Sequence, residues 1–318
     1  MIKIKAAIYL IAFILLLSLM PREAGATPEE RLAGENRYET AAILSQVVWP
    51  NGAEQVVLAR GDDFADALAS TPFAAKIKGP VLLTQRGKLP EVTKEEINRL
   101  GAKKVWVMGG KNAISNNVIS ELQQQNLQVE RVSGVDRTET ALKIARKVGT
   151  AQQEAIVVNK KQFPDAIAVG PYAALKGIPI LLTDKDKLSH DNKEFLKKVK
   201  KTYFIGGKAV LSDGLMEEVP NAERIAGESR YVTSVRIAER FFPYADYPVI
   251  ATGEYFADGL TGSLLAAKRG QPILLVQHYN VDDSVKRFFY YNNVSNYTVL
   301  GGYNAVHQYI YSKLVEGR

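Results

Sequence analysis

Short apolar runs alternate with longer amphipathic segments along most of the chain. The runs QVVLA (55–59), PVLLT (80–84) and KVWVM (104–108) carry few polar positions, as strands buried on both faces of a sheet do. Segments of helical period lie between them, such as FADALASTPFAAKI (64–77) and EVTKEEINRL (91–100). Regular alternation of strands and helices predicts a parallel sheet with helices packed on it.

Four landmarks recur three times in the same order. The first is an Arg-x-x-Gly-x-x-Arg motif that begins at Arg31, Arg131 and Arg224. The others are FADA, FPDA or FADG around Asp66, Asp165 and Asp258; the tripeptides VLL (81–83), ILL (180–182) and ILL (273–275); and the pairs Gly109–Gly110, Gly206–Gly207 and Gly301–Gly302. Four ordered landmarks in triplicate establish an internal repeat.

The repeats predict the fold class and the domain organisation. We expect three tandem open parallel-sheet α/β units, each long enough to form its own core, packed with pseudo-threefold symmetry because the connections are short. The boundaries predicted from the motifs are a signal peptide over residues 1–26 and repeats over 27–130, 131–223 and 224–318.

The first 26 residues are typical of a secretory signal peptide. A basic opening, MIKIK, precedes fifteen apolar residues, and a small-x-small pattern ends at Ala26. An uncleaved anchor is the alternative, although fifteen residues are short for a membrane span. We therefore expect a secreted protein that has no membrane contact after cleavage.

The charge and the cysteine content of the chain limit the classes of partner and the kind of stabilisation that we expect. Without residues 1–26 the formal charge falls from +7 to +5, because three cations and one anion are removed. Such a charge, spread over a long chain, favours an acidic partner but is not a nucleic-acid footprint. The chain has no cysteine, so the domains must be stable without disulfides.

The arginine motif is predicted to join a strand to a helix. Asn36, Asp136 and Ser229 are good N-cap residues, which places the second arginine of each motif (Arg37, Arg137, Arg230) at the first helical position. A helix N-terminus carries positive partial charge and favours anions. Three cations at such positions therefore indicate a negative group opposite each one, either an internal carboxylate or an external anionic ligand.

The internal candidates are the landmark aspartates, which we expect in the first turn of the following helix, where they could pair with an arginine. The Gly-Gly pairs end strands at the edge where parallel sheets bind ligands, although turn geometry alone also explains them. The VLL and ILL tripeptides are predicted to be buried strand centres. We assign a structural or ion-pair role to Asp66, Asp165, Asp258, Gly109, Gly110, Gly206, Gly207, Gly301 and Gly302.

Together these motifs resemble the cell-wall-binding repeat type 2 family of Gram-positive surface proteins. The match runs from Arg31 to the C-terminus. The resemblance implies three α/β modules in a trimer-like arrangement that hold a protein non-covalently on an anionic wall polymer, teichoic-acid-like or polysaccharide. It also implicates the Ile-Leu-Leu tripeptide in anchoring. The residues expected to contact polymer are Arg31, Arg37, Tyr38, Arg131, Arg137, Arg224, Arg230 and Tyr231.

The repeats depart from the family pattern unequally. Thr138 replaces the motif Tyr in the second repeat, and Val232, Ser234 and Gly259 interrupt the third. We therefore expect Arg37 and Arg230, which keep a neighbouring Tyr, to contact polymer more than Arg137 does.

An enzyme is the weaker alternative. The histidines are His190, His278 and His307, at non-equivalent positions, and there is no cysteine nucleophile or GxSxG motif. A zinc amidase needs histidine ligands, and the repeats leave little of the sequence for a catalytic domain. We expect a non-catalytic wall-binding protein without cofactor or metal; a wall hydrolase such as an amidase, or a regulatory helper that has a wall hydrolase as partner, is the alternative.

Overall fold

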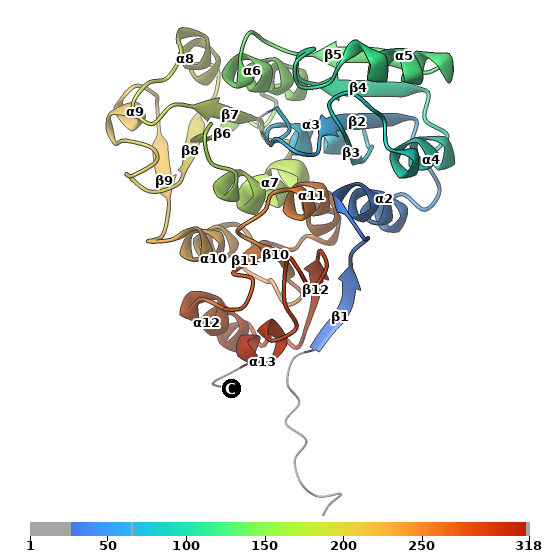
Figure 1. The fold of residues 1–318 in the computed structure, drawn as a ribbon. Helices are drawn as coiled ribbons and strands as arrows, with labels where there is room; N and C mark the ends of the chain where they lie inside the picture. The colour runs from blue at the N-terminus through green and yellow to red at the C-terminus, as the bar shows by residue number, and fades with distance from the viewer. Residues whose placement is uncertain (1–26, 65, 316–318) are drawn as a thin grey trace, which may run out of the picture.

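The computed structural model describes residues 27–64 and 66–315, and these form three four-stranded sheets in which every strand pair is parallel. The predicted α/β class with three parallel sheets is confirmed (Figure 1). The proposed signal peptide lies outside the described residues. We call the sheets, with their helices, the first, second and third modules.

The first and second modules have one topology. The first sheet has the order β3-β2-β4-β5, with β2 (Gln55–Arg60), β3 (Val81–Thr84), β4 (Lys104–Met108) and β5 (Gln128–Val132). The second has the order β7-β6-β8-β9, with β6 (Glu154–Asn159), β7 (Ile180–Thr183), β8 (Lys201–Ile205) and β9 (Ala222–Ile225). In both, the last strand crosses the predicted boundary to the next sequence repeat: β5 spans 130/131 and β9 spans 223/224.

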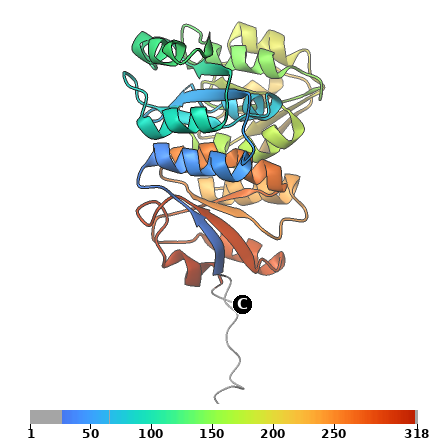
Figure 2. The same ribbon diagram turned by 90° about the vertical axis from the view of Figure 1, so that its right-hand side faces the viewer.

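The third module is closed by the beginning of the chain. Its sheet has the order β1-β12-β10-β11, with β1 (Thr27–Leu32), β10 (Val249–Thr252), β11 (Ile273–Val276) and β12 (Asn296–Leu300). Leu32 is in register with Leu300, and Figure 2 shows β1 beside strands from the other end of the chain. β1 therefore lies in the repeat predicted over 27–130 but completes the sheet of the repeat predicted over 224–318.

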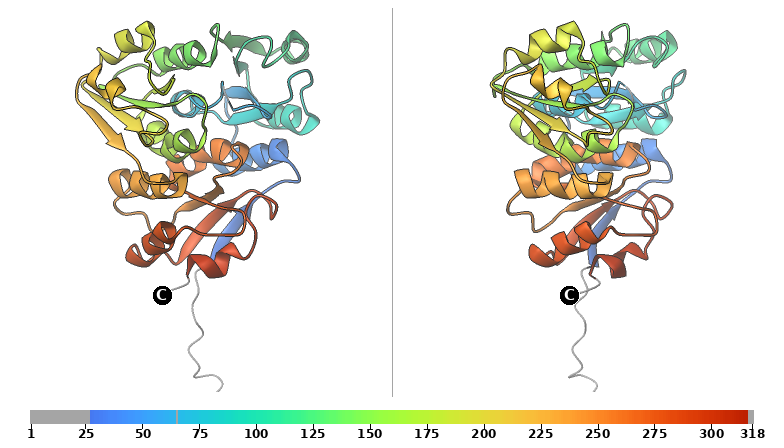
Figure 3. Two further views of the ribbon diagram at one scale, coloured as in Figure 1. Left: turned by 60° about the vertical axis from the view of Figure 1, so that its left-hand side comes forward. Right: turned by 90° about the vertical axis from the view of Figure 1, so that its left-hand side faces the viewer.

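The helices divide into three equivalent sets. One helix of each module lies at the centre: α3 (Ser70–Lys76), α7 (Pro164–Lys176) and α11 (Ala257–Arg269). A second set bridges neighbouring modules: α2 (Arg37–Val48), α6 (Arg137–Val148) and α10 (Arg230–Phe241). The outer helices are α4 (Glu91–Arg99), α5 (Asn116–Gln124), α8 (His190–Leu196), α9 (Gly214–Glu217), α12 (Asp283–Tyr291) and α13 (Ile310–Leu314). Figures 1 and 3 show the resulting pseudo-threefold arrangement.

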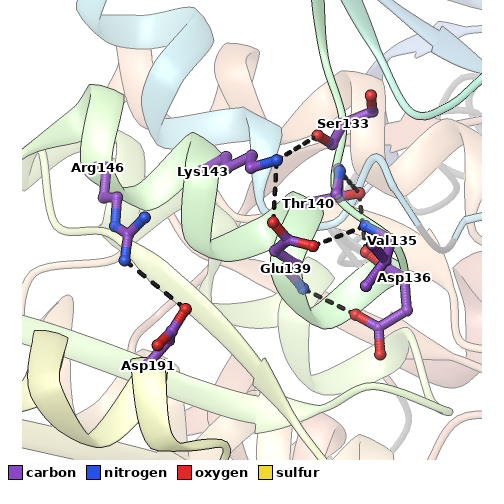
Figure 4. A network of polar contacts seen from close by, with 9 residues as sticks. Ser133, Val135, Asp136, Glu139, Thr140, Lys143, Arg146 and Asp191 are labelled. Carbon is purple, nitrogen blue, oxygen red and sulfur yellow. Dashed lines mark hydrogen bonds and ion pairs between the residues drawn. The ribbon is translucent and has the colours of Figure 1, made fainter.

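The bridging helices begin where the motif predicts. Asn36, Asp136 and Ser229 cap α2, α6 and α10 with their side-chain oxygens. In α6, Glu139 turns back and accepts a hydrogen bond from the amide of Val135 at 2.7 Å, while its own amide donates to Asp136 Oδ1 (Figure 4). This reciprocal cap satisfies donors that the first helical turn leaves unpaired.

The main hydrophobic core is shared by all three modules. One continuous cluster contains residues such as Val57, Ile156 and Ile250 from the three sheets, whereas the two smaller clusters lie within the first and the second module. Each module thus depends on its neighbours for part of its core. The VLL and ILL tripeptides are buried as predicted, but on the edge strands β3, β7 and β11, where α2, α6 and α10 cover them.

One predicted helix start is wrong. Asp165 and Asp258 lie in the first turns of α7 and α11, but α3 begins only at Ser70, and Asp66 lies in the turns that precede it. The amides of Ala67 and Ser70 donate to carbonyls three residues earlier. This tighter spacing separates the aspartate from the regular helix.

Candidate functional site

Three phenylalanines meet on the pseudo-threefold axis. Phe64, Phe163 and Phe256 precede the three landmark aspartates, and their ring centroids lie 5.6, 5.8 and 6.2 Å apart in tilted or edge-on pairs. Phe64 follows β2, Phe163 follows β6 and Phe256 follows β10. The carboxyl ends of β2, β6 and β10 therefore converge on one face of the molecule.

Each second arginine joins two modules at this face. The guanidinium of Arg37 lies 6.0 Å from the ring centre of Phe256 in the third module and donates to the carbonyl of Gly61 in the first, at 2.5 Å. Arg137 lies over Phe64 and donates to the carbonyl of Lys160 at 3.1 Å. Arg230 repeats the arrangement over Phe163 and at the carbonyl of Gly253.

The landmark aspartates pack against the Gly-Gly turns. Gly109, Gly206 and Gly301 have positive φ angles of 103°, 123° and 86°, a conformation that glycine adopts without strain. A Cβ on Gly206 would lie 2.6 Å from Oδ2 of Asp165, and the other two aspartates occupy the same place. The first glycine of each pair is therefore required by both the turn and the carboxylate.

The arginines act on these carboxylates at longer range. None of the direct ion pairs among the described residues joins a second arginine to a landmark aspartate. Burial raises the pKa of Asp165 to about 7, against the opposing charge of Arg230. Burial likewise raises the pKa of Asp66 and of Asp258, opposed in part by Arg137 and Arg37.

The raised pKa of Asp165 predicts a pH dependence of stability. An acid whose folded pKa is raised favours folding while it is protonated, so this contribution is lost as pH rises from its ordinary pKa of 3.8 through about 7. We expect the wild-type free energy of unfolding to fall between pH 5 and pH 8 by on the order of 2 kcal/mol more than that of Asp165→Asn. Urea unfolding of both proteins at the two pH values measures this difference. Parallel pH dependences would contradict it.

A pocket opens at the carboxyl edge of each sheet. The third-module pocket, about 580 Å³, is lined by Arg37, Asp258 and Gly302 among others. The first-module pocket, about 550 Å³, has Arg137, Asp66 and Gly110 in the equivalent places. The second-module pocket, about 470 Å³, has Arg230, Asp165 and Gly207. Volumes of this size suit small-molecule ligands or single units of a polymer.

The first arginines have internal partners instead. Arg131 donates to the carbonyls of Gly109 and Ile114 at 2.7 and 2.9 Å, and Arg31 and Arg224 donate in the same way to Gly301 and Gly206. All three are half-buried. These bonds hold the Gly-Gly turns in place, so they favour a structural role for the first arginine over the ligand contact expected from the motif.

The motif tyrosines also pack internally. A Cβ on Gly61 would lie 2.6 Å from Cε1 of Tyr38, and one on Gly253 would lie 2.8 Å from the same atom of Tyr231. The second repeat has Thr138 in place of the Tyr and Lys160 in place of the Gly. The Tyr and the Gly thus change together, because the ring needs a neighbour without a side chain.

The three pockets differ in charge. Four basic and three acidic side chains line the first-module pocket, the basic ones being Arg60, Lys111, Arg137 and Lys160. Two of each kind line the second-module pocket, and one basic and two acidic side chains line the third-module pocket. The pocket that contains Arg137 thus has the most basic lining of the three, whereas the neighbouring tyrosines led us to expect the stronger polymer contacts at Arg37 and Arg230.

The motifs did not identify two sets of residues at the site: the three phenylalanines and the residue that follows each Gly-Gly pair. The phenylalanines recur beside all three aspartates, which was a signal for a shared contact, but nothing in the pattern placed them on one axis. The residue after each Gly-Gly pair (Lys111, Lys208 or Tyr303) is exposed and lines a pocket. Its identity differs between repeats, so repeat comparison alone did not reveal it.

Neither a metal site nor a membrane span is found in the part of the chain that the structure describes. Within 27–64 and 66–315 no three histidine or carboxylate side chains are grouped so as to hold a metal ion. No helix in that part of the chain has the length and apolarity needed to cross a membrane.

A family model agrees with the repeats. The model described as cell wall binding domain 2 (CWB2) matches residues 31–119, 131–216 and 224–311. Each match begins at the first arginine of a motif and therefore at the strand that completes the preceding sheet.

Two curated relatives come from Bacillus subtilis. The chain is 28% identical over 296 residues to the N-acetylmuramoyl-L-alanine amidase LytC, covering 92% of this chain and 59% of the relative. It is 35% identical over 260 residues to an amidase enhancer, covering 81% of this chain and 36% of the relative. The chain thus spans less than two thirds of either relative.

Two solved structures share the fold. Cwp8 from Clostridium difficile aligns with a TM-score of 0.83 at 28% identity, over 90% of this chain and 51% of Cwp8. Cwp6 from the same organism aligns with a TM-score of 0.81 at 27% identity, over 91% of this chain and 48% of Cwp6.

Proposed function

Because the chain belongs to the cell wall binding domain 2 family, we propose that it is a secreted, non-catalytic protein that attaches non-covalently to an anionic polymer of the cell wall. The observation that carries this proposal is the set of three arginine-lined pockets around one phenylalanine cluster. A guanidinium binds phosphate and carboxylate groups well because its donors form a planar fork.

The arrangement of the pockets supports binding to a polymer. Arg37, Arg137 and Arg230 each use one terminal nitrogen on a carbonyl and are at least partly exposed, so further donors remain for a ligand. A single exposed arginine binds an anion weakly. Three such sites on one rigid face raise the apparent affinity for a repeating anion through avidity.

The wall-binding proposal predicts how the protein distributes between isolated walls and solution. We expect it to pellet with walls at low salt, and to pellet less as salt rises, because exposed charges are screened beyond about 8 Å at physiological ionic strength. Extraction of the anionic polymers should release most of the bound protein. The measurement is co-sedimentation with intact and extracted walls; equal binding to both would contradict an anionic ligand.

The relatives favour a second candidate, a wall hydrolase or a regulatory helper of one. One relative is named as an amidase and another as an amidase enhancer. No histidine lines any of the three pockets, which is why we favour a binder over a hydrolase. Zymography on purified wall separates the candidates: clearing by the protein alone indicates a hydrolase, and clearing only when it stimulates an added amidase indicates a helper.

A further inference from the structure

The exposed aromatic side chains gather in the third module. Among the described residues, the large hydrophobic side chains exposed beyond position 240 are all tyrosines: Tyr244, Tyr255, Tyr279, Tyr290, Tyr291, Tyr303 and Tyr309. Exposed aromatic groups that cluster on one surface commonly mark a binding site.

Several of these rings share the carboxyl edge of the third sheet. Tyr255 follows β10, Tyr279 follows β11, and Tyr303 and Tyr309 follow β12. Tyr255 and Tyr303 line the third-module pocket beside Arg37. The aromatic edge is therefore continuous with the proposed polymer site.

Next to the pocket, Tyr279, His307 and Tyr309 form an aromatic row. The ring of His307 lies 4.8 Å from that of Tyr279 and 4.8 Å from that of Tyr309, at interplanar angles of 42° and 38°. His278 packs edge-on against Tyr279 at 4.0 Å. Tyr279 and Tyr309 remain 55% and 62% exposed, so more than half of each side chain is accessible to a ligand.

Hydrogen bonds between the surrounding loops and α13 fix the segments that carry the row. The amide of His307 donates to the carbonyl of His278 at 3.0 Å, which ties the loop after β12 to the loop after β11. Glu254 Oε1 accepts from the amide of His278, and Lys313 donates to Asn280 Oδ1 at 3.0 Å. A ligand would therefore meet rings that are already ordered, which lowers the entropic cost of binding.

The first and second modules have other residue types at the positions equivalent to these tyrosines. The bond from His307 to His278 recurs from Ser115 to Arg86 and from Ser212 to Lys185, which fixes the equivalent positions. Tyr279 corresponds to Gly87 and Asp186, Tyr303 to Lys111 and Lys208, and Tyr309 to Asn117 and Gly214. The third module thus has a tyrosine where the other two have a lysine, and two further tyrosines where they have glycine, aspartate or asparagine.

We propose that this aromatic row is a binding site for neutral sugar rings of a glycan. The apolar C–H face of a pyranose stacks on an aromatic ring, while its hydroxyl groups can reach polar side chains such as Glu254, Asn280 and Lys313. Tyrosine provides both a flat apolar face and a polar tip. The inference rests on the proposed function in that the wall polymer would supply the sugar, with Arg37 holding an anionic group beside it.

Neutral oligosaccharides test the row separately from the arginines. Isothermal titration of the whole protein with tetramers of glucose, galactose and N-acetylglucosamine, in about 1 M NaCl to screen charge contacts, is expected to show saturable binding of at least one. Tyr279→Ala and Tyr309→Ala should each weaken that binding at least tenfold, whereas Tyr279→Phe, which keeps the ring, should retain it. Tyr244→Ala and Tyr291→Ala remove tyrosines outside the row that are more exposed than Tyr279 and Tyr309, and they should leave the binding unchanged.

Three results would overturn the proposal: no tetramer binds, the alanine variants bind as the wild type does, or the control variants lose as much. Melting temperatures of all variants show whether any loss comes from unfolding. Failure here would leave the salt-sensitive wall binding intact, and failure of the wall experiment would leave this titration intact, so the two proposals can be separated.

Discussion

A protein that begins at Ala33, and so lacks the whole of β1, is expected to lose the cooperative unfolding of its third module. β1 supplies the strand beside β12, the buried side chain of Leu32, and the guanidinium of Arg31, which holds the carbonyls of Gly301 and Val306. Removing a buried leucine costs about 2–5 kcal/mol, and each lost hydrogen bond about 0.5–1.5 kcal/mol. The sum is comparable with the whole stability of a typical domain.

Urea unfolding followed by near-ultraviolet circular dichroism measures this loss. A circular permutant in which residues 27–32 follow residue 315 through a Gly-Ser linker is the matched control, because the end of α13 and the start of β1 lie at the same end of the molecule (Figure 1). The permutant has the same strand in a new chain order and should recover stability. If the truncated protein unfolds like the wild type, β1 is not integral to the third module.

Replacing the second arginines is expected to abolish wall binding in steps. The single variant Arg137→Gln should weaken wall binding roughly tenfold. The double variant Arg137→Gln with Arg230→Gln should weaken it much more, because avidity falls with each lost site. Each change also removes a bond to a carbonyl of the neighbouring module. We therefore expect a cost of about 1–3 kcal/mol in stability for each arginine as well.

A variant that loses the same number of positive charges elsewhere distinguishes binding at the arginine sites from attraction by the overall charge of the protein. The double variant Lys103→Gln with Lys200→Gln also removes two positive charges. Both lysines are exposed and directly precede β4 and β8, at the edge of the sheets opposite the pockets. Co-sedimentation with walls should then be nearly that of the wild type. If the lysine pair costs as much binding as the arginine pair, the attraction is diffuse; if the folded arginine variants bind normally, the arginines are staples between modules.

The sequence predicted the helix starts and the strands well, because these features depend mainly on residues that are neighbours along the chain. The capping residues Asn36, Asp136 and Ser229 begin their helices as expected, since capping needs only neighbours along the chain. The buried tripeptides form strands for a similar reason, through their own apolarity. Three parallel sheets followed from the alternation of these elements.

What the pattern left open depends on contacts distant in sequence. RLAG reads as the end of a strand, but nothing in it indicates that the strand pairs with residues 296–300. The need for glycine at position 61, which leaves room for the ring of Tyr38, became visible only in the folded structure. The backbone carbonyls that accept from Arg37, Arg137 and Arg230 were likewise not foreseen, because a backbone carbonyl has no signature in the sequence.

The closing strand also sets an order of assembly. A nascent chain emerges from its N-terminus, so the first sheet has all its strands after residue 132 and the second after residue 225, while β1 waits for β12 until residue 300. Contacts so distant in sequence form slowly. Once β12 has formed, its edge stays open until β1 pairs with it, and β1 of another copy offers the same hydrogen bonds. Concentrated refolding therefore favours exchange of this strand between chains, giving swapped dimers or longer linear assemblies.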